Sequence, residues 1–459
     1  SVEELYNEIE RSVEAGVMKS NPLKDNGFVP GDYSQENYDR IDLHRPYVDN
    51  IVLVNAAGKP MYRETDLIDV WFDSGSMPYA QLHYPFEGEM ARGTEADRQA
   101  MIHSDYKGTP IPPAYFPADF INEGVDQTRG WFFTLHAIAT MIFDSVAFKN
   151  VISTGLVLDA KGNKMSKHVG NVTNPFEMME KYGADPVRFY MMTNSEPWDN
   201  LKFDPEGVDE VRRKFFGTLY NTYSFLALYA NVDGFDPETM LNQGNLAERP
   251  EIDRWIISKA NSLIINVCKQ LNDYDPTRAG RLIDNFVNDD LSNWYVRLNR
   301  KRFWGKEMDS DKLNAYQTLY SCLMTVAKLV APFAPFYADR LYHDLGGKME
   351  SVHLESCPVA DTEAIDAELE ARMDIAQKIT SMTLALRRKV NIKVRQPLAQ
   401  LMIPAIDDKQ KQRICAVKDL IKNEVNVKEV NFVENSGFLV KKVKCNFRVM
   451  GKKFGKLMK

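Results

Sequence analysis

The sequence predicts an α/β layer with parallel strands, followed by an all-α helical bundle and a small α+β unit at the C-terminal end. Three observations support this order. Between about residues 61 and 200, strand-like runs such as Val151–Leu158 alternate with helical runs such as 130–145, which is typical of parallel sheets. After about residue 205 the pattern becomes helical, and from residue 392 short alternating runs return.

Each part has a local basis. The first sixty residues combine a short helix with polar loops and a strand-like run at 51–54, and we expect them to lead into the α/β layer. Further along, helices are expected at 276–303 and 311–346, the second interrupted at Pro332 and Pro335. Before them, five apolar residues recur at the spacing of one helix face: Ile256, Ala260, Leu263, Val267 and Leu271.

The last part shows alternating runs at 398–403, 425–432 and 437–443, which predict strands. Composition is that of an ordinary soluble protein, with 44% hydrophobic residues and a net charge of -7, so contacts to nucleic acid must come from local patches. The five cysteines are widely spaced without a CxxC pair, no His pair has metal-site spacing and no apolar run is long enough to span a membrane. We expect a cytoplasmic monomer without a bound metal.

A lysine-rich turn gives the sharpest local signal. Residues 159–167 follow a strand and place three lysines within seven positions around Gly162. Mobile ammonium groups on such a loop can surround a polyphosphate and stabilise charge that develops on it. A solvated β-turn is the alternative, and the pattern is too short to decide alone.

Two further stretches have polar and aromatic residues near strand ends. In 116–133 a strand is followed by Gly124, which would let the chain turn tightly into a helix, and Asp126 would either grip ribose hydroxyls or cap that helix. In 69–78 an aromatic pair is followed by turn-forming residues. Trp71 there is either a core residue or one wall of an apolar pocket.

Together the three stretches resemble one family. Asp69–Gly75, Glu123–Phe132 and Lys164–Lys167 are similar, in order and spacing, to the C-terminal half of the active site of class I isoleucyl-tRNA synthetases. The resemblance extends to His44–Asp49, Tyr182–Arg188, the Trp294–Tyr295 region and Val394–Leu398.

The resemblance implies a role for each matching residue. Glu123, Gly124 and Asp126 would contact the ribose and adenylate, and Gln127 the aminoacyl carbonyl. Trp71 and Trp131 would wall the isoleucine pocket. Lys164 and Lys167 would be catalytic on the triphosphate, with Met165 and Ser166 completing the ATP-binding loop, and ATP with Mg²⁺ would be the substrate complex.

The resemblance also implies a domain order. A segment over 1–60 leads into the C-terminal half of a Rossmann-type catalytic domain at 61–204. Connecting helices that contact the tRNA stem follow at 205–245, then an anticodon-binding helical bundle at 246–390 and the start of a C-terminal domain at 391–459. The expected partners are ATP, L-isoleucine and tRNA(Ile).

Two departures from the family pattern limit what the chain does alone. His168 stands where the family's loop has Ser, and the partner signature His-x-Gly-His is absent around all seven histidines. There is also no room for the inserted editing domain. That domain matters for specificity, because one methylene in an apolar pocket changes the binding free energy by only about 1–3 kcal/mol, for which isoleucyl-tRNA synthetase is itself the standard example. We therefore expect a fragment that is inactive alone.

Basic residues suggest where RNA would bind. Trp294, Arg297, Arg300, Lys301 and Arg302 put cations and stacking surfaces on one helix, or else form a solvated face with a packed aromatic side. Two other clusters are candidates for RNA phosphate: the first is Arg387, Arg388, Lys389, Lys393 and Arg395, and the second comprises the lysines and Arg448 after residue 440.

Three alternatives remain at this stage. A valyl- or leucyl-tRNA synthetase shares the same chemistry. A non-catalytic tRNA-binding module would have lost activation altogether. A small nucleotidyltransferase shares the phosphate loop, but it has no use for the helical half after residue 205.

Overall fold

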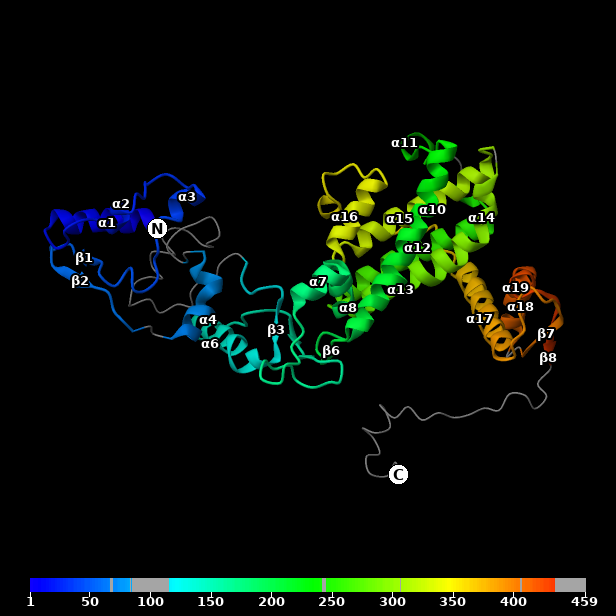
Figure 1. Ribbon diagram of the computed structural model, residues 1–459, viewed down its shortest axis with the longest axis horizontal. Helices are drawn as coiled ribbons and strands as arrows, with labels where there is room; N and C mark the ends of the chain where they lie inside the picture. The colour runs from blue at the N-terminus through cyan, green and yellow to red at the C-terminus, as the bar shows by residue number, and fades with distance from the viewer. Residues whose placement is uncertain are drawn as a thin grey trace, which may run out of the picture. The chain divides into compact units, whose positions relative to one another are not determined.

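The computed structural model divides into two compact units, 1–151 and 152–459, and each is considered by itself (Figure 1). The division falls inside the expected domain 61–204. The reason is that helix α8 (Ala184–Asn194), which belongs to that stretch, packs against helix α13 (Pro276–Asn285) of the bundle. The structure describes the following residues: 1–66, 69–82, 84, 115–241, 245–305, 307–404 and 407–433.

Unit 1 begins with helix α1 (Val2–Glu14), whose N-terminus is closed by a capping box between Ser1 and Glu4. Its buried side packs on strand β1, and Ile9, Leu23 and Phe28 form a small core. The other elements of this part are α2 (Pro22–Asp25), α3 (Gln35–Tyr38) and the antiparallel pair β1 (Val52–Val54) and β2 (Pro60–Tyr62).

The second half of unit 1 is built on two packed helices, α4 (Val70–Ala80) and α6 (Trp131–Phe143). The stretch 69–78 is thus helical rather than turn-forming, because Asp69 caps it and its apolar face packs on α6. Strand β3 (Ile121–Gly124) and the 3-10 helix η1 (Val125–Arg129) precede α6, and β4 (Val151–Thr154) begins where unit 1 ends.

Unit 2 begins with a small α/β part. Strand β5 (Val157–Leu158) pairs in parallel with β6 (Leu201–Lys202). Strand β6 shares an apolar core with α7 (Pro175–Tyr182), α8 (Ala184–Asn194) and α9 (Pro205–Val211). The parallel direction is as expected, but the described strands are short and paired. The predicted strand 151–158 is broken at Gly155, where an added Cβ would lie 2.3 Å from the carbonyl oxygen of Asp199.

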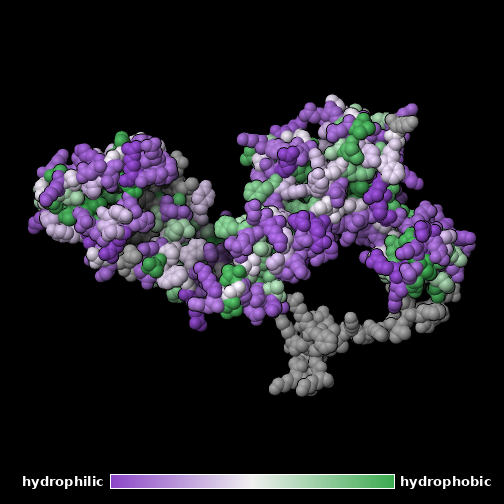
Figure 2. Space-filling view, viewed as in Figure 1, coloured by the Kyte–Doolittle hydropathy of each residue, from purple (hydrophilic) through white to green (hydrophobic). Residues whose placement is uncertain are grey.

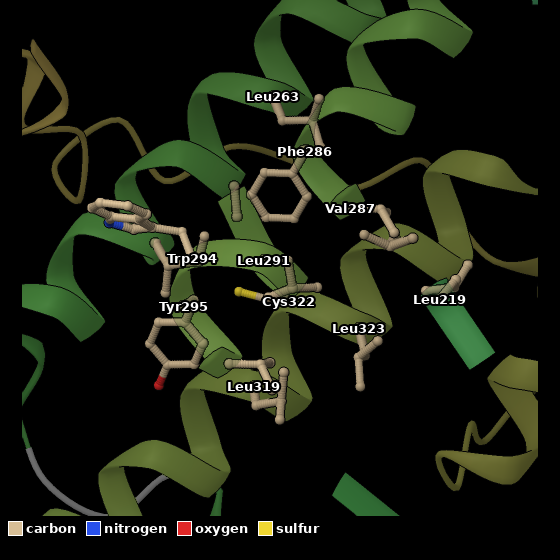
Figure 3. Close-up of a cluster of buried hydrophobic side chains, with 14 of the residues drawn as sticks. Leu219, Leu263, Phe286, Val287, Leu291, Trp294, Tyr295, Leu319, Cys322 and Leu323 are labelled. Atoms are coloured by element: carbon tan, nitrogen blue, oxygen red, sulfur yellow. The ribbon is translucent and has the colours of Figure 1, made fainter. Parts of the chain in front are cut away.

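A helical bundle follows and confirms the predicted all-α region (Figure 1). The periodic residues Ile256 to Val267 lie on the buried face of α12. A large apolar core joins the helices, with Tyr295, Leu319 and Cys322 among its members (Figure 3). The elements are η2 (Arg212–Phe216), α10 (Gly217–Asp233), α11 (Pro237–Met240), η3 (Leu246–Glu248), α12 (Glu251–Asn272), α13 (Pro276–Asn285), η4 (Phe286–Val296), α14 (Arg297–Trp304), α15 (Ser310–Val330), α16 (Pro335–Asp344) and η5 (Val352–Leu354).

The chain ends in the expected small α+β unit. The long helix α17 (Ala367–Lys389) packs on α18 (Asp408–Ala416) and α19 (Lys418–Val425), and β7 (Leu398–Pro404) pairs in parallel with β8 (Val427–Val433). The expected strand at 437–443 and the lysines after residue 440 lie outside the described residues.

Candidate functional site

In unit 1, the structure brings Trp71, Gln127 and Trp131 together around Gly130. A Cβ added at Gly130 would lie 2.7 Å from Oε1 of Gln127 and 2.9 Å from the Trp71 ring. Only glycine therefore lets the backbone pass between these two side chains. Trp71 keeps 44% of its surface exposed, so its ring is partly available to a ligand.

Pro78 explains how Trp131 is held. Proline has no N–H, so the carbonyl of Ser74, one turn earlier in α4, lacks its usual helical partner. The indole Nε1 of Trp131 donates to that carbonyl instead, at 2.9 Å. The gap in the hydrogen-bond ladder of α4 thus fixes the orientation of the Trp131 ring on α6.

The start of α6 is capped by Gln127 rather than by Asp126. Oε1 of Gln127 accepts from the backbone N–H of Trp131 at 3.0 Å, whereas Asp126 makes no cap contact and is exposed. Gly124 has a φ of -66°, which any residue adopts, so a special turn does not require it. An added Cβ there would instead lie 2.5 Å from Oδ1 of Asp126, and it would displace that carboxylate.

Beside Trp131 lies a mostly apolar cavity of about 190 Å³. Met77, Leu135 and Ile121 are among its walls, but Trp71 is not. Of the two expected pocket tryptophans, Trp131 therefore lies against this cavity, whereas Trp71 lies beside Gly130 and is not part of the cavity wall.

In unit 2, the lysine-rich loop is shaped by a carboxylate. Oδ1 of Asp159 accepts from the backbone N–H groups of Lys161 and Asn163 at 3.0 and 2.7 Å, and Oδ2 accepts from the Asn171 amide at 3.0 Å. The backbone hydrogen bond of Asn163, followed by the Asn171 amide, lowers the pKa of Asp159 to about 2. Asp159 thus stays ionised and holds the turn, in which Gly162 adopts a φ of +87°.

The lysine side chains of this loop are exposed to solvent. Lys164 and Lys167 are exposed, and neither forms an ion pair with any residue that the structure describes. Asn171 closes the loop by accepting from the Ser166 N–H at 2.9 Å and donating to the Lys164 carbonyl at 3.2 Å. The two ammonium groups are therefore free to meet an anionic ligand.

Met165 anchors the loop from below. Its side chain packs against the core formed by Val187, Tyr190 and Leu201, whereas Lys164 and Lys167 stay exposed. His168 is exposed, and its backbone N–H donates to Oγ of Ser166 at 3.3 Å.

Sequence reasoning missed three residues of this loop region. Asp159 and Asn171 shape the loop, and Lys202 on β6 lies so close to Gly162 that an added Cβ would come within 3.0 Å of its Cε. The Asp-x-x-Gly-Asn turn pattern could have identified Asp159. Lys202 enters only through the pairing of β5 with β6, which no local pattern predicts.

The expected RNA-binding helix divides into two kinds of residue. Trp294 is only 4% exposed and belongs to the bundle core (Figure 3). Arg302 forms a two-pronged ion pair with the fully buried Asp253 at 2.7 and 2.8 Å. Both side chains are therefore part of the folded bundle, which favours the alternative of a packed face for these two residues.

The other members of this helix face solvent. Arg300, Lys301 and Trp304 are exposed, with 57% of Trp304 accessible. Arg297 is partly exposed, lies over the Trp294 ring at 5.6 Å and pairs with Glu424. The available cationic surface of α14 is thus smaller than the sequence suggested.

Two kinds of feature are absent from the described part of the chain. No group of three or more His, Cys, Asp or Glu side chains there is arranged to hold a metal ion. No helix among the same residues is long and apolar enough to cross a membrane.

Comparisons with known proteins match both halves of the chain. The family model for class I tRNA synthetases for isoleucine, leucine, methionine and valine matches residues 29–204. The model for the anticodon-binding domain of tRNA ligases matches residues 253–403. The first match contains the Trp71–Trp131 cluster and the lysine loop, and the second contains the helices from most of α12 to α17.

Curated relatives match over the whole chain. The isoleucine–tRNA ligase of Bacteroides thetaiotaomicron is 65% identical, that of Porphyromonas gingivalis 62% and that of Cytophaga hutchinsonii 54%, each covering 100% of this chain. The chain spans 38% of the length of each of these relatives. With both family models matched and such identity along its entire length, the chain belongs to the isoleucyl-tRNA synthetases of class I.

Proposed function

We propose that this chain supplies half of the active site and the tRNA-binding bundle of an isoleucine–tRNA ligase. Such an enzyme activates L-isoleucine with ATP and Mg²⁺ and then transfers it to tRNA(Ile). The observation that carries the proposal is the Asp159-built loop, which presents Lys164 and Lys167 without carboxylate partners. A loop that served only as a surface turn would not need this scaffold.

Each candidate site residue has a proposed role that follows from its chemistry. Lys164 and Lys167 would bind the triphosphate and stabilise the charge that develops as the isoleucine carboxylate attacks the α-phosphate. Met165 and Ser166 would hold the loop, with Glu123, Gly124 and Asp126 at the ribose. Gln127 would meet the aminoacyl group with its Nε2, because its Oε1 already accepts from Trp131.

Trp71 and Trp131 would enclose the isoleucine side chain, and the apolar cavity beside Trp131 supports that assignment. On the helical half, Arg297, Arg300 and Lys301 would approach tRNA. We include Asp159 and Asn171 among the positioning residues, since both hold the loop backbone.

The test uses the complete synthetase. Lys167→Ala should lower the rate of isoleucine-dependent ATP–pyrophosphate exchange by about 100-fold or more while isoleucine binding changes little, because the ammonium acts mainly on the transition state. The matched control is Lys269→Ala, which removes an exposed lysine on α12. Equal losses of exchange and isoleucine binding would contradict the catalytic role.

The same assay separates the alternatives. Exchange driven better by valine or leucine than by isoleucine would indicate a different synthetase. An absence of exchange with all three amino acids, together with retained tRNA binding, would favour a non-catalytic tRNA-binding module.

A further inference from the structure

The connection between α17 and β7 is organised by a buried arginine. Arg387 is 3% exposed and has no carboxylate partner among the described residues. Its guanidinium donates to four backbone carbonyls: those of Lys393 at 3.2 Å, Gln396 at 2.9 Å, Val425 at 2.8 Å and Asn426 at 3.0 Å. One side chain thus ties the loop after α17 to the turn between α19 and β8.

Asn426 holds the same loop from the other side. It adopts a φ of +51°, and its Nδ2 donates to the carbonyl of Val394 at 2.8 Å while its own carbonyl accepts from the Leu398 N–H at 3.1 Å. The carbonyls of residues 393, 394 and 396 are therefore all directed inward. The loop backbone has few ways to rearrange without losing these bonds.

The side chains of the loop are correspondingly outside. Arg388, Lys389, Lys393 and Arg395 are all exposed, and none forms an ion pair with a residue of the described structure. The sequence from 375 to 406 contains six basic residues and no acidic one. We call these four exposed cations the α17–β7 basic loop.

Hydrophilic residues cover most of the visible surface (Figure 2), and the loop differs from many of them in its ion pairing. Elsewhere exposed cations commonly lie beside carboxylates, as Arg213 does beside Asp209 at 2.8 Å and Arg40 beside Glu36 at 3.0 Å. The groove next to the loop, between η4 and α17, contains Asp289 and Asp374 together with its cations. The loop therefore presents four cations without ion-pair partners among the described residues, on a backbone that is held in place.

We propose that the α17–β7 basic loop is a preorganised binding site for the phosphate backbone of RNA. The proposal rests on the proposed function, which makes tRNA the polyanion that this chain meets. Polyphosphate binding rewards clustered cations because each neutralised phosphate releases condensed counterions. Fixing the backbone beforehand lowers the entropy lost when the four side chains engage.

The experiment measures binding of a tRNA(Ile) transcript to the complete synthetase as salt rises from about 50 to about 200 mM. The double variant Lys393→Gln with Arg395→Gln should weaken binding about tenfold and reduce the slope of log K against log salt by about 1 to 2. The charge-conserving variant Lys393→Arg with Arg395→Lys should retain the original slope.

The matched control is Lys19→Gln with Lys269→Gln, which removes two exposed, unpaired lysines elsewhere. An equal weakening in this control, or no change in the loop variant, would overturn the proposal. Loop-dependent binding to phosphatidylserine vesicles with unchanged tRNA binding would overturn it too, in favour of a membrane surface.

Isoleucine-dependent ATP–pyrophosphate exchange is measured on the same samples, since it requires no tRNA. Loss of exchange in the unmutated enzyme would refute the proposed function, whereas normal exchange with an unchanged salt slope would refute only the loop assignment.

Discussion

Two basic segments of similar composition behave differently in this structure. Helix α14 carries four cations between residues 297 and 302, and the α17–β7 basic loop carries four between 388 and 395. In the first, Arg302 forms an ion pair with Asp253 inside the bundle, and Arg297 forms one with Glu424. In the second, all four cations are exposed and unpaired within the described structure.

The difference lies in what the buried arginine binds. Arg302 is paired with a carboxylate, so its charge is neutralised locally. Arg387 binds only carbonyls, so it fixes a backbone while leaving a net positive charge beneath the loop. A cluster of basic residues in a sequence therefore says little about RNA binding until the partners of each residue are known.

The largest expected effect follows from breaking the buried ion pair. Asp253→Ala should destabilise unit 2 by about 3–5 kcal/mol, because it removes the buried carboxylate of Arg302, leaving only the more exposed Asp311 as its ion-pair partner, and also removes the acceptor of the Tyr295 hydroxyl. Urea unfolding followed by tryptophan fluorescence measures the change.

Arg300→Ala, on the exposed side of the same helix, is the control and should change stability by less than about 0.5 kcal/mol. Replacing both partners, with Asp253→Leu and Arg302→Met, should restore much of the loss. Similar losses for Asp253→Ala and Arg300→Ala would remove the distinction drawn between the two faces of α14.

An intermediate effect is expected at the other arginine. Arg387→Met should cost about 2–4 kcal/mol, because four backbone carbonyls lose a charged donor. The loss should be local: amide hydrogen exchange should accelerate over 391–397 and 425–427 more than in the bundle. The exposed neighbour Arg388→Met serves as control, and uniform acceleration across unit 2 would argue against a local clamp.

The smallest effect concerns a crowded carboxylate pair. Burial, followed by the charge of Asp275, raises the pKa of Glu196 above its usual 4.5. A carboxyl whose pKa is raised on folding stabilises the protein in acid, and this stabilisation is lost as the pH rises through the folded pKa. Glu196→Gln should therefore increase Tm over that of the parent protein, and this increase should be larger at pH 8 than at pH 4.

The shift should be at most about 2 °C, measured by calorimetry at both pH values. Glu180→Gln, on the exposed side of α7, should show no such pH-dependent difference. A larger gain at pH 4 than at pH 8 would show that Glu196 is ionised more easily in the folded protein than outside it.

The sequence predicted most of the helical architecture because helices depend on local periodicity. The apolar spacing from Ile256 to Leu271 corresponds to α12, and Pro332 and Pro335 mark the break between α15 and α16. The helix at 130–145 and the strand at 398–403 were also found close to their expected limits. The segment 69–78 was misread, because the packing of α4 against α6 outweighs the helix-breaking tendency of Pro78.

The candidate site was predictable as a set of residue types and not as a set of contacts. Motif order indicated Trp71, Trp131 and the two lysines, since each motif is contiguous in the chain. That Gln127 caps α6, that Asp159 holds the lysine loop and that Lys202 lies beside Gly162 required coordinates. Each of these contacts joins side chains whose approach depends on the path of the backbone.

By itself, then, the sequence determined the order of the elements, the family and the position of the candidate lysine loop, because periodicity and contiguous motifs are local properties. Only the tertiary structure decided which cations are available. Arg302 and Arg388 are both basic residues on helices, but Asp253 lies 49 residues before Arg302 in the chain and meets it only in the folded bundle. Charge pairing over such separations is decided by packing, because it depends on distances that the linear order does not contain.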